Sequence, residues 1–163
     1  MAIGQFLRVN RKYCLLPGVL AGALLAGCGG ADEAVSDGAV EQALAAEGQT
    51  ILSTLNRAQT AYYLETGEFA TDIETLDANL PTATDQYRYE IMLTDPGKAV
   101  AIAVAQQPEL VSYTAAVYVV SADGDTLDGI CKTATASTVP PAVPTLEASQ
   151  IRCPKTAQPI QSD

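Results

Sequence analysis

The sequence predicts an α+β domain in which one long N-terminal helix packs on a roughly four-stranded antiparallel sheet, with a disulfide loop near the C-terminus. Three observations indicate this fold. Apolar residues recur every three or four positions between residues 36 and 67, apolar and polar residues alternate in the stretches that follow, and two cysteines bracket a proline-rich C-terminal segment. The first pattern is typical of an amphipathic helix and the second of half-buried strands.

Residues 1–27 are expected to be an export signal. Arg8, Arg11 and Lys12 make a basic start without any acidic residue, and an apolar run follows over residues 14–27. This run is shorter than the ~20 residues needed to span a bilayer. We therefore expect a cleaved signal and not a permanent membrane span.

Cys28 is the predicted site of lipid attachment. Leu25-Ala26-Gly27-Cys28 resembles a bacterial lipobox, at which the cysteine thiol is joined to diacylglycerol and the chain is cut just before it. Acyl chains would anchor the new N-terminus in a membrane leaflet, and residues 28–35 are expected to be a flexible tether. The alternative is an ordinary secretory signal with a coincidental cysteine. Loss of residues 1–27 would leave six basic and 19 acidic residues, so the charge would change from −10 to −13.

The globular domain is expected over residues 36–163 and begins with a helix of about 30 residues. Ser36 is a favourable N-cap, and Gly67 is favourable just past a helix end. The expected core stripe of this helix is Val40, Leu44, Gly48, Ile51, Leu55, Ala58 and Tyr62. Asn56, Arg57 and other polar residues fall off the stripe. Gly48 is expected to weaken the middle of the helix by about 1 kcal/mol relative to alanine.

An antiparallel meander is predicted after the helix. A loop or short helical turn over residues 72–84 leads to strands expected at residues 87–93, 98–105, 110–120 and 126–132. Turns are indicated by Asp95-Pro96-Gly97 and by Asp123-Gly124. The segment Asp123 to Gly129 has the look of a calcium loop, but Leu127 and Ala134 stand where ligands are needed, so a hairpin turn is expected.

Residues 133–163 contain five prolines and little periodicity, so a loop and tail are expected there. Cys14 would leave with the signal and Cys28 would be acylated, which leaves Cys131 and Cys153 to pair with each other. In an oxidising compartment this disulfide would stabilise the domain by about 3 kcal/mol. Two free thiols are the alternative.

A family resemblance rests on the block of residues 55–70, Leu-Asn-Arg-Ala-Gln-Thr-Ala-Tyr-Tyr-Leu-Glu-Thr-Gly-Glu-Phe-Ala. It resembles the Asn-Arg-Ala-Gln…Tyr-Tyr…Glu-x-Gly-x-Phe segment of cyanobacterial pilins and their type IV pilin-like G/H relatives. Residues 87–91, residues 112–118 and the stretch from Ile130 to Cys153 match the same pattern in order. The resemblance covers about residues 50–155 and implies the globular fold of a type IV pilin.

The same resemblance implies a structural or accessory role in the envelope of a cyanobacterium-like Gram-negative cell, in the periplasm or at the outer membrane. Pilin subunits or the pilus or secretion machinery would be the partners. Pilins carry a prepilin cleavage site and a long apolar helix start, whereas Cys28 and an acidic tether stand at that place here. The resemblance therefore implies the fold without implying entry into a filament.

Composition argues against most catalytic chemistry. The chain has no histidine, which excludes Ser-His-Asp and Cys-His nucleophile systems and histidine-bound zinc. We nominate no catalytic residue, metal site or cofactor, and we do not expect an enzyme. The 19 acidic residues outnumber the 9 basic residues, which argues against nucleic acid as a partner.

Candidate partner contacts are Arg57, Tyr62 and Tyr63. A surface or intradomain ion pair is the plainer expectation for Arg57. The tyrosines Tyr62, Tyr63, Tyr87, Tyr89, Tyr113 and Tyr118 could line a pocket, which would make the chain an envelope lipoprotein that binds a small ligand on a pilin-like scaffold. We expect instead that they pack the helix on the sheet with their hydroxyls at the rim.

Overall fold

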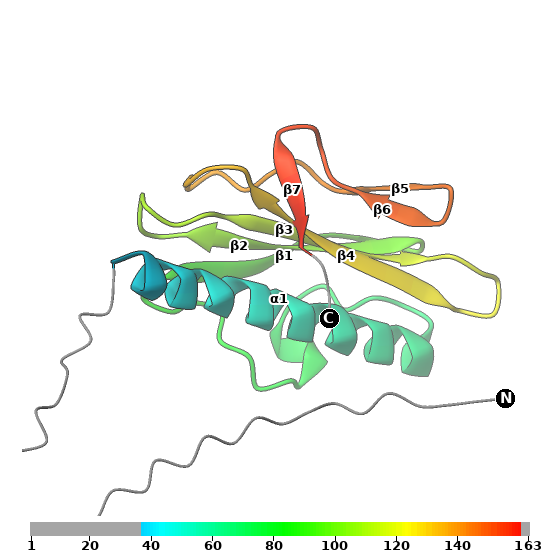
Figure 1. Ribbon diagram of the computed structural model, residues 1–163. Helices are drawn as coiled ribbons and strands as arrows, with labels where there is room; N and C mark the ends of the chain where they lie inside the picture. The colour runs from blue at the N-terminus through cyan, green and yellow to red at the C-terminus, as the bar shows by residue number, and fades with distance from the viewer. Residues whose placement is uncertain (1–36, 161–163) are drawn as a thin grey trace, which may run out of the picture. The chain divides into compact units, whose positions relative to one another are not determined.

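One long helix lies along one face of an antiparallel sheet (Figure 1). The computed structural model describes residues 37–160, so the expected signal, Cys28 and tether lie outside the described residues. The elements are α1 (Asp37–Thr66), the 3-10 helix η1 (Glu74–Leu76), β1 (Tyr87–Asp95), β2 (Lys98–Ala105), β3 (Tyr113–Val119), β4 (Thr126–Thr133), β5 (Thr145–Glu147), β6 (Gln150–Arg152) and β7 (Ala157–Ile160). The α+β prediction is confirmed.

The C-terminal region holds more structure than predicted. The main sheet has five strands in the order β1-β2-β3-β4-β7, because β7 pairs antiparallel with β4. β5 and β6 form a separate two-stranded hairpin. These strands have three or four residues each, too few to show a period in the sequence. The loop and tail expected over residues 133–163 thus contain three short strands in the part that the structure describes.

Small side chains bring α1 close to the sheet. Ala101, Ala103 and Ala115 face Leu52 and Leu55 of the helix in one buried cluster. A β-carbon at Gly48 would lie 3.0 Å from the rings of both Tyr87 and Tyr113. The glycine that the sequence marks as a weak point of the helix is thus the place where two tyrosine rings pack against its backbone.

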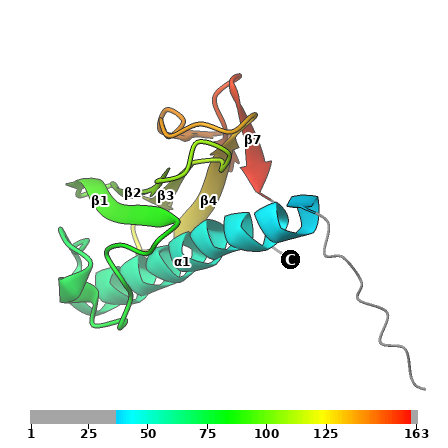
Figure 2. The same ribbon diagram turned by 90° about the vertical axis from the view of Figure 1, so that its left-hand side faces the viewer.

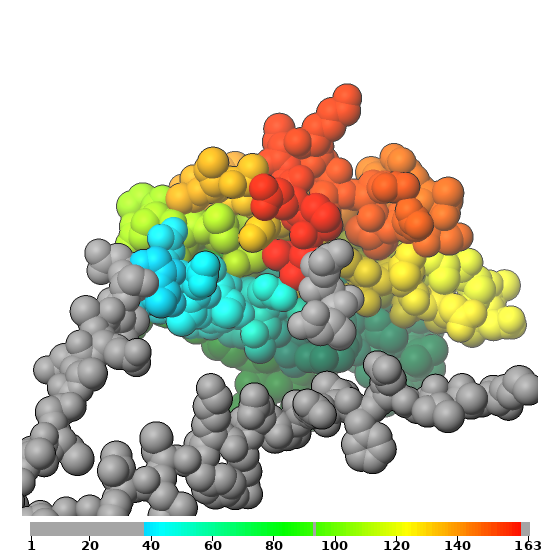
Figure 3. Space-filling model, viewed as in Figure 1, coloured from blue at the N-terminus to red at the C-terminus, as the bar shows by residue number. Residues whose placement is uncertain are grey.

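The opposite face of the sheet is covered by the proline-rich segment after β4, so the sheet is the middle of three layers (Figure 2). The hydroxyls of Thr114 and Tyr118 donate to the carbonyls of Pro141 and Pro144, both at 2.6 Å. Ile151 of β6 contacts Gly129 of β4 so closely that a β-carbon there would be 2.8 Å away. In the space-filling view the helix lies below and the orange and red C-terminal segments lie above (Figure 3).

The core face of α1 differs in part from the predicted stripe. Val40 at its start is 46% exposed, and Ala58 and Tyr62 are only half-buried. Asn56 and Gln59 are buried instead, each 2% exposed. The stripe was built on apolar residues, whereas these two amides enter the core because they find hydrogen-bond partners there.

Candidate functional site

The three predicted contact residues lie in the second half of α1. Arg57 is exposed, and its Nη2 donates to the hydroxyl of Thr54 at 3.4 Å. Among residues 37–160, ion pairs join Arg88 to Glu90 and Lys98 to Asp95, so the expected ion pair of Arg57 is wrong within that range. The side chain projects from the solvent side of the helix, where no carboxylate of the described chain approaches it within the distance of an ion pair.

The two tyrosines beside Arg57 are both half-buried. The ring of Tyr63 stacks on Phe69, with 4.7 Å between ring centroids, and packs with Ala99 and Val117 in a second core cluster. Tyr63 therefore has a packing role, and the side chain of Tyr62 stays partly accessible on α1.

Two buried amides in the same block connect α1 to the rest of the domain. Asn56 Nδ2 donates to Asp128 Oδ2 of β4 at 2.9 Å. Gln59 Nε2 donates to the carbonyl of Ala70 at 2.8 Å, and the N–H of Ala70 donates back to Gln59 Oε1 at 3.0 Å. Our sequence reasoning missed both roles. The signal that could have found them is the presence of two amides next to the apolar stripe, three residues apart and so on one helix face.

Three other tyrosines fill the space between the helix and the sheet, as expected. The hydroxyls of Tyr87 and Tyr113 donate to the carbonyls of Val111 and Ala45, and that of Tyr89 donates to Glu47 Oε1. Burial raises the pKa of all three phenols, and for Tyr89 the charge of Glu47 adds to the effect. Tyr87 and Tyr113 are almost fully buried in the packed core, so these rings do not enclose a ligand pocket.

The disulfide Cys131–Cys153 is present, with its Cα atoms 5.6 Å apart. Cys131 lies fully buried in β4, and Cys153 directly follows β6. The bond therefore joins the main sheet to the β5–β6 hairpin. This prediction is confirmed.

The expected hairpin turn between β3 and β4 is also present. Ser121 accepts a hydrogen bond from the N–H of Asp125, and Gly124 has a φ of +90°. Within residues 37–160 there is no cluster of three or more acidic or cysteine side chains that could hold a metal ion.

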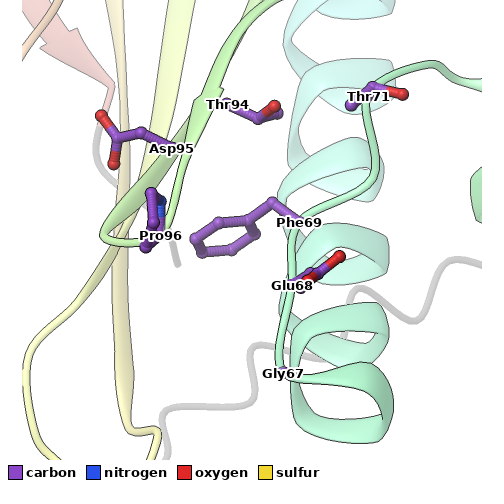
Figure 4. A pocket seen from close by; sticks show the side chains of 7 residues that line it. All are labelled: Gly67, Glu68, Phe69, Thr71, Thr94, Asp95 and Pro96. Carbon is purple, nitrogen blue, oxygen red and sulfur yellow. The ribbon is translucent and has the colours of Figure 1, made fainter.

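A groove follows the outer edge of β1. We call it the β1 groove and define it as the space between residues 67–74 and residues 89–96. It consists of two open hollows of about 330 Å³ and 220 Å³, both lined by Thr71. Figure 4 shows the larger one, in which the ring of Phe69 points toward Pro96 of the β1–β2 turn.

The outer wall of the β1 groove is held in place by the block that carries the family resemblance. Gln59 fixes Ala70, and Tyr63 stacks on Phe69. Asp72 Oδ1 accepts hydrogen bonds from the hydroxyl and the N–H of Thr75, which lowers the pKa of this carboxyl. The wall therefore has a defined conformation although it is a connecting loop.

A family model described as type IV pilin-like G and H matches residues 45–154, more than half of the chain. The chain belongs to this family. The matched segment includes most of α1, the four meander strands and both disulfide cysteines. Comparisons with curated proteins and with solved structures gave no match.

The family assignment agrees with the resemblance drawn from residues 55–70. Type IV pilin-like proteins are generally structural, and the lining of the β1 groove combines hydroxyls, carboxylates and apolar side chains. No helix in the described part of the type IV pilin-like chain is long and apolar enough to cross a membrane.

Proposed function

We propose that this chain is a lipid-anchored, type IV pilin-like envelope protein with a structural or accessory role in protein-protein contact during pilus, secretion or envelope assembly. One combination carries the proposal: a pilin-like family match over residues 45–154 downstream of the lipobox-like Leu25-Ala26-Gly27-Cys28. Membership of this family suggests an exported or envelope protein. Acylation of Cys28 would then supply the membrane attachment.

The tether limits where the domain works. Residues 28–35 can extend over at most about 28 Å, since a fully extended chain advances no more than ~3.5 Å per residue. The domain would therefore stay close to its leaflet, whether in the periplasm or at the outer membrane, and meet partners that are themselves at the membrane. Pilin subunits and the pilus or secretion machinery fit that condition.

The exposed side of α1 supports a role in contact. Arg57 and Leu64 are separated by seven residues, two helical turns, and so lie on one face. Leu64 is 64% exposed, whereas the half-buried Tyr62 lies two positions earlier and so on another side of the helix. Arginine and tyrosine are both residue types enriched at protein interfaces.

The anchor is tested by the intact mass of the protein extracted from membranes. We expect a chain that starts at acylated Cys28 and is about 2 Da lighter than its dithiol form, since a disulfide lacks the two thiol hydrogens. The Cys28→Ser variant should lose the acyl mass and leave the membrane fraction. A chain that retains residues 1–27, or one that begins at Cys28 without lipid, would contradict lipid anchoring.

The contact role is tested by crosslinking in intact cells followed by recovery of the tagged protein. We expect a pilin subunit or a component of the pilus or secretion machinery to be recovered. Arg57→Ala combined with Tyr62→Ala should reduce the yield, whereas Glu41→Ala combined with Gln42→Ala, on exposed positions of the same helix, should not. Recovery of no envelope component by the wild-type protein would overturn the proposal.

A further inference from the structure

The two edges of the main sheet differ in whether another strand can join them. On β7, the N–H of Ala157 already donates to the carbonyl of Pro154 at 2.9 Å. In an antiparallel ladder every second residue directs its backbone groups away from the partner strand. After Ala157, the next such residue of β7 is Pro159, and proline has no N–H. An edge strand without free donors does not pair with a further strand. The β7 edge is therefore closed.

The β1 edge is closed at one end and open at the other. The N–H of Tyr89 donates to the carbonyl of Thr82, and the N–H of Thr84 donates to the carbonyl of Tyr87, both at 2.8 Å. Beyond this point the register shifts between Ile91 and Leu93. Every second residue of β1 directs its N–H away from β2, so Ile91 does so two positions after Tyr89. The register shift moves this alternation by one residue, and Thr94 is therefore the next residue whose N–H faces outward. Within residues 37–160, no other backbone segment pairs with these two residues.

The open end of β1 coincides with the β1 groove. Ile91, Thr94 and Asp95 line the groove from the β1 side, and the hollows beside them hold about 330 Å³ and 220 Å³. Pro96 and the 7% of Phe69 that stays exposed give one hollow an apolar surface, and Ile91 with the nearly fully buried Ile73 does the same for the other. Unpaired backbone next to side-chain pockets is the arrangement by which sheet edges bind extended peptides.

The charge of the groove indicates what kind of strand would enter it. Its lining includes five carboxylates and no basic side chain, namely Glu68, Asp72, Glu74, Glu90 and Asp95. Arg88 lies 2.9 Å from Glu90 and Lys98 lies 3.6 Å from Asp95, which leaves a local charge of −3. A second copy paired edge to edge would place two such acidic grooves together, which is electrostatically unfavourable.

We propose that the β1 groove binds an extended, lysine- or arginine-containing segment of a partner protein, which adds as a strand to residues 91–95 of β1. This inference rests on the proposed contact function and specifies the chemistry of the partner. Five residues of strand extend over roughly 17 Å. Their backbone would pair with Ile91 and Thr94, apolar side chains would lie on Phe69 and Pro96, and basic ones would reach Glu68 and Glu74.

The test is binding of a short fluorescent peptide of alternating lysine and valine to the full mature protein in detergent. We expect saturable binding. The same peptide with alternate backbone nitrogens methylated should bind at least about tenfold more weakly, because it cannot complete the ladder and one lost hydrogen bond already corresponds to that factor. A peptide of alternating glutamate and valine should not bind.

Two variants locate the binding in the groove. Thr94→Pro removes an outward N–H at an edge position, where proline is tolerated, and should weaken binding about tenfold. Glu68→Gln with Glu74→Gln should weaken binding and reduce its dependence on salt. Glu41→Gln with Glu109→Gln makes the same charge change at exposed acids outside the groove and should leave binding unchanged. Should Thr94→Pro fail to fold by circular dichroism, the methylated peptide and the charge variant decide.

Equal binding of the methylated peptide, or no binding by the wild type, would overturn the proposal. A homodimer that Thr94→Pro dissociates would assign the edge to a second copy and would overturn it too. The contact function fails separately, when crosslinking of the wild type recovers no envelope component. Undiminished recovery of such a component by Thr94→Pro would reject the groove and leave the contact function intact.

Discussion

Gln59 holds Ala70 with both ends of its side-chain amide. Nε2 donates to the carbonyl of Ala70 at 2.8 Å, and Oε1 accepts from the N–H of Ala70 at 3.0 Å. Both residues are 2% exposed, so water would not reach these groups if the two hydrogen bonds were lost. The segment that follows α1 is therefore bonded back to the helix, through a residue that lies eleven positions after Gln59 in the sequence.

Replacement of Gln59 by leucine should lower the free energy of unfolding by about 3 kcal/mol. The change leaves the N–H and the carbonyl of Ala70 buried without partners, and each such group costs about 1–3 kcal/mol. Urea unfolding followed by circular dichroism measures the loss. Gln42→Leu, at an exposed position of the same helix, should change stability by no more than about 0.5 kcal/mol. Equal stability of the two variants would show that the amide pair contributes nothing.

Gly48→Ala should destabilise the domain although alanine is the better helix former. The propensity gain is about 1 kcal/mol, whereas a β-carbon 3.0 Å from the Tyr87 and Tyr113 rings forces repacking that costs about 1–3 kcal/mol. Gly38→Ala is the matched control, because a β-carbon there meets nothing within 4 Å. We expect thermal unfolding to give a lower midpoint for Gly48→Ala than for Gly38→Ala. The reverse order would mean that the rings move aside freely.

Loss of the disulfide should cost about 3 kcal/mol, the value expected for a closed loop of this length. Cys131→Ser with Cys153→Ser, compared with the wild type in urea, measures it. Because the bond joins β4 to the hairpin, hydrogen exchange should rise first in β5, β6 and β7. A uniform rise across α1 and β1 would instead indicate that the C-terminal strands are integral to the cooperative core.

Alkaline pH should destabilise the fold through its buried phenols. Burial raises the pKa of Tyr87, Tyr89 and Tyr113 above the value of about 10 that tyrosine has in the unfolded chain. The stability that comes from keeping these phenols protonated in the folded state is therefore complete below about pH 10. It declines as the pH rises further, because the unfolded state then holds fewer protons than the folded state. Urea midpoints measured across this range should fall. Tyr89→Phe should flatten the decline, and an unchanged slope would contradict this cause.

Local signals predicted the first half of the fold well. α1 runs from Asp37 to Thr66, within one residue of the predicted ends, and at its end the N–H of Gly67 donates to the carbonyl of Tyr63 at 2.8 Å. The bounds of β2 agree with the prediction, since a turn signal stands on its N-terminal side and a proline segment on the other. These features depend on a few adjacent residues and so are visible in one sequence.

The features that were missed depend on contacts between distant residues. The burial of Asn56 requires Asp128, 72 positions away, and β7 exists as a strand only because β4 offers an edge to it. The β1 groove arises because residues 67–74 lie along β1 after the chain has turned back from α1. No periodicity in the sequence carries this information, so the sequence alone places Asn56 off the apolar stripe and predicts a loop and tail for the proline-rich segment.

The blocked donors of β7 limit where a further strand can join this side of the main sheet. A sheet that accepts strands at both edges can polymerise, whereas a sheet that accepts a strand at one edge ends the array that it joins. Pro159 and the turn bond of Ala157 thus keep β7 from serving as a second edge of this kind. A sheet blocked along β7 is less prone to grow across neighbouring molecules from that strand.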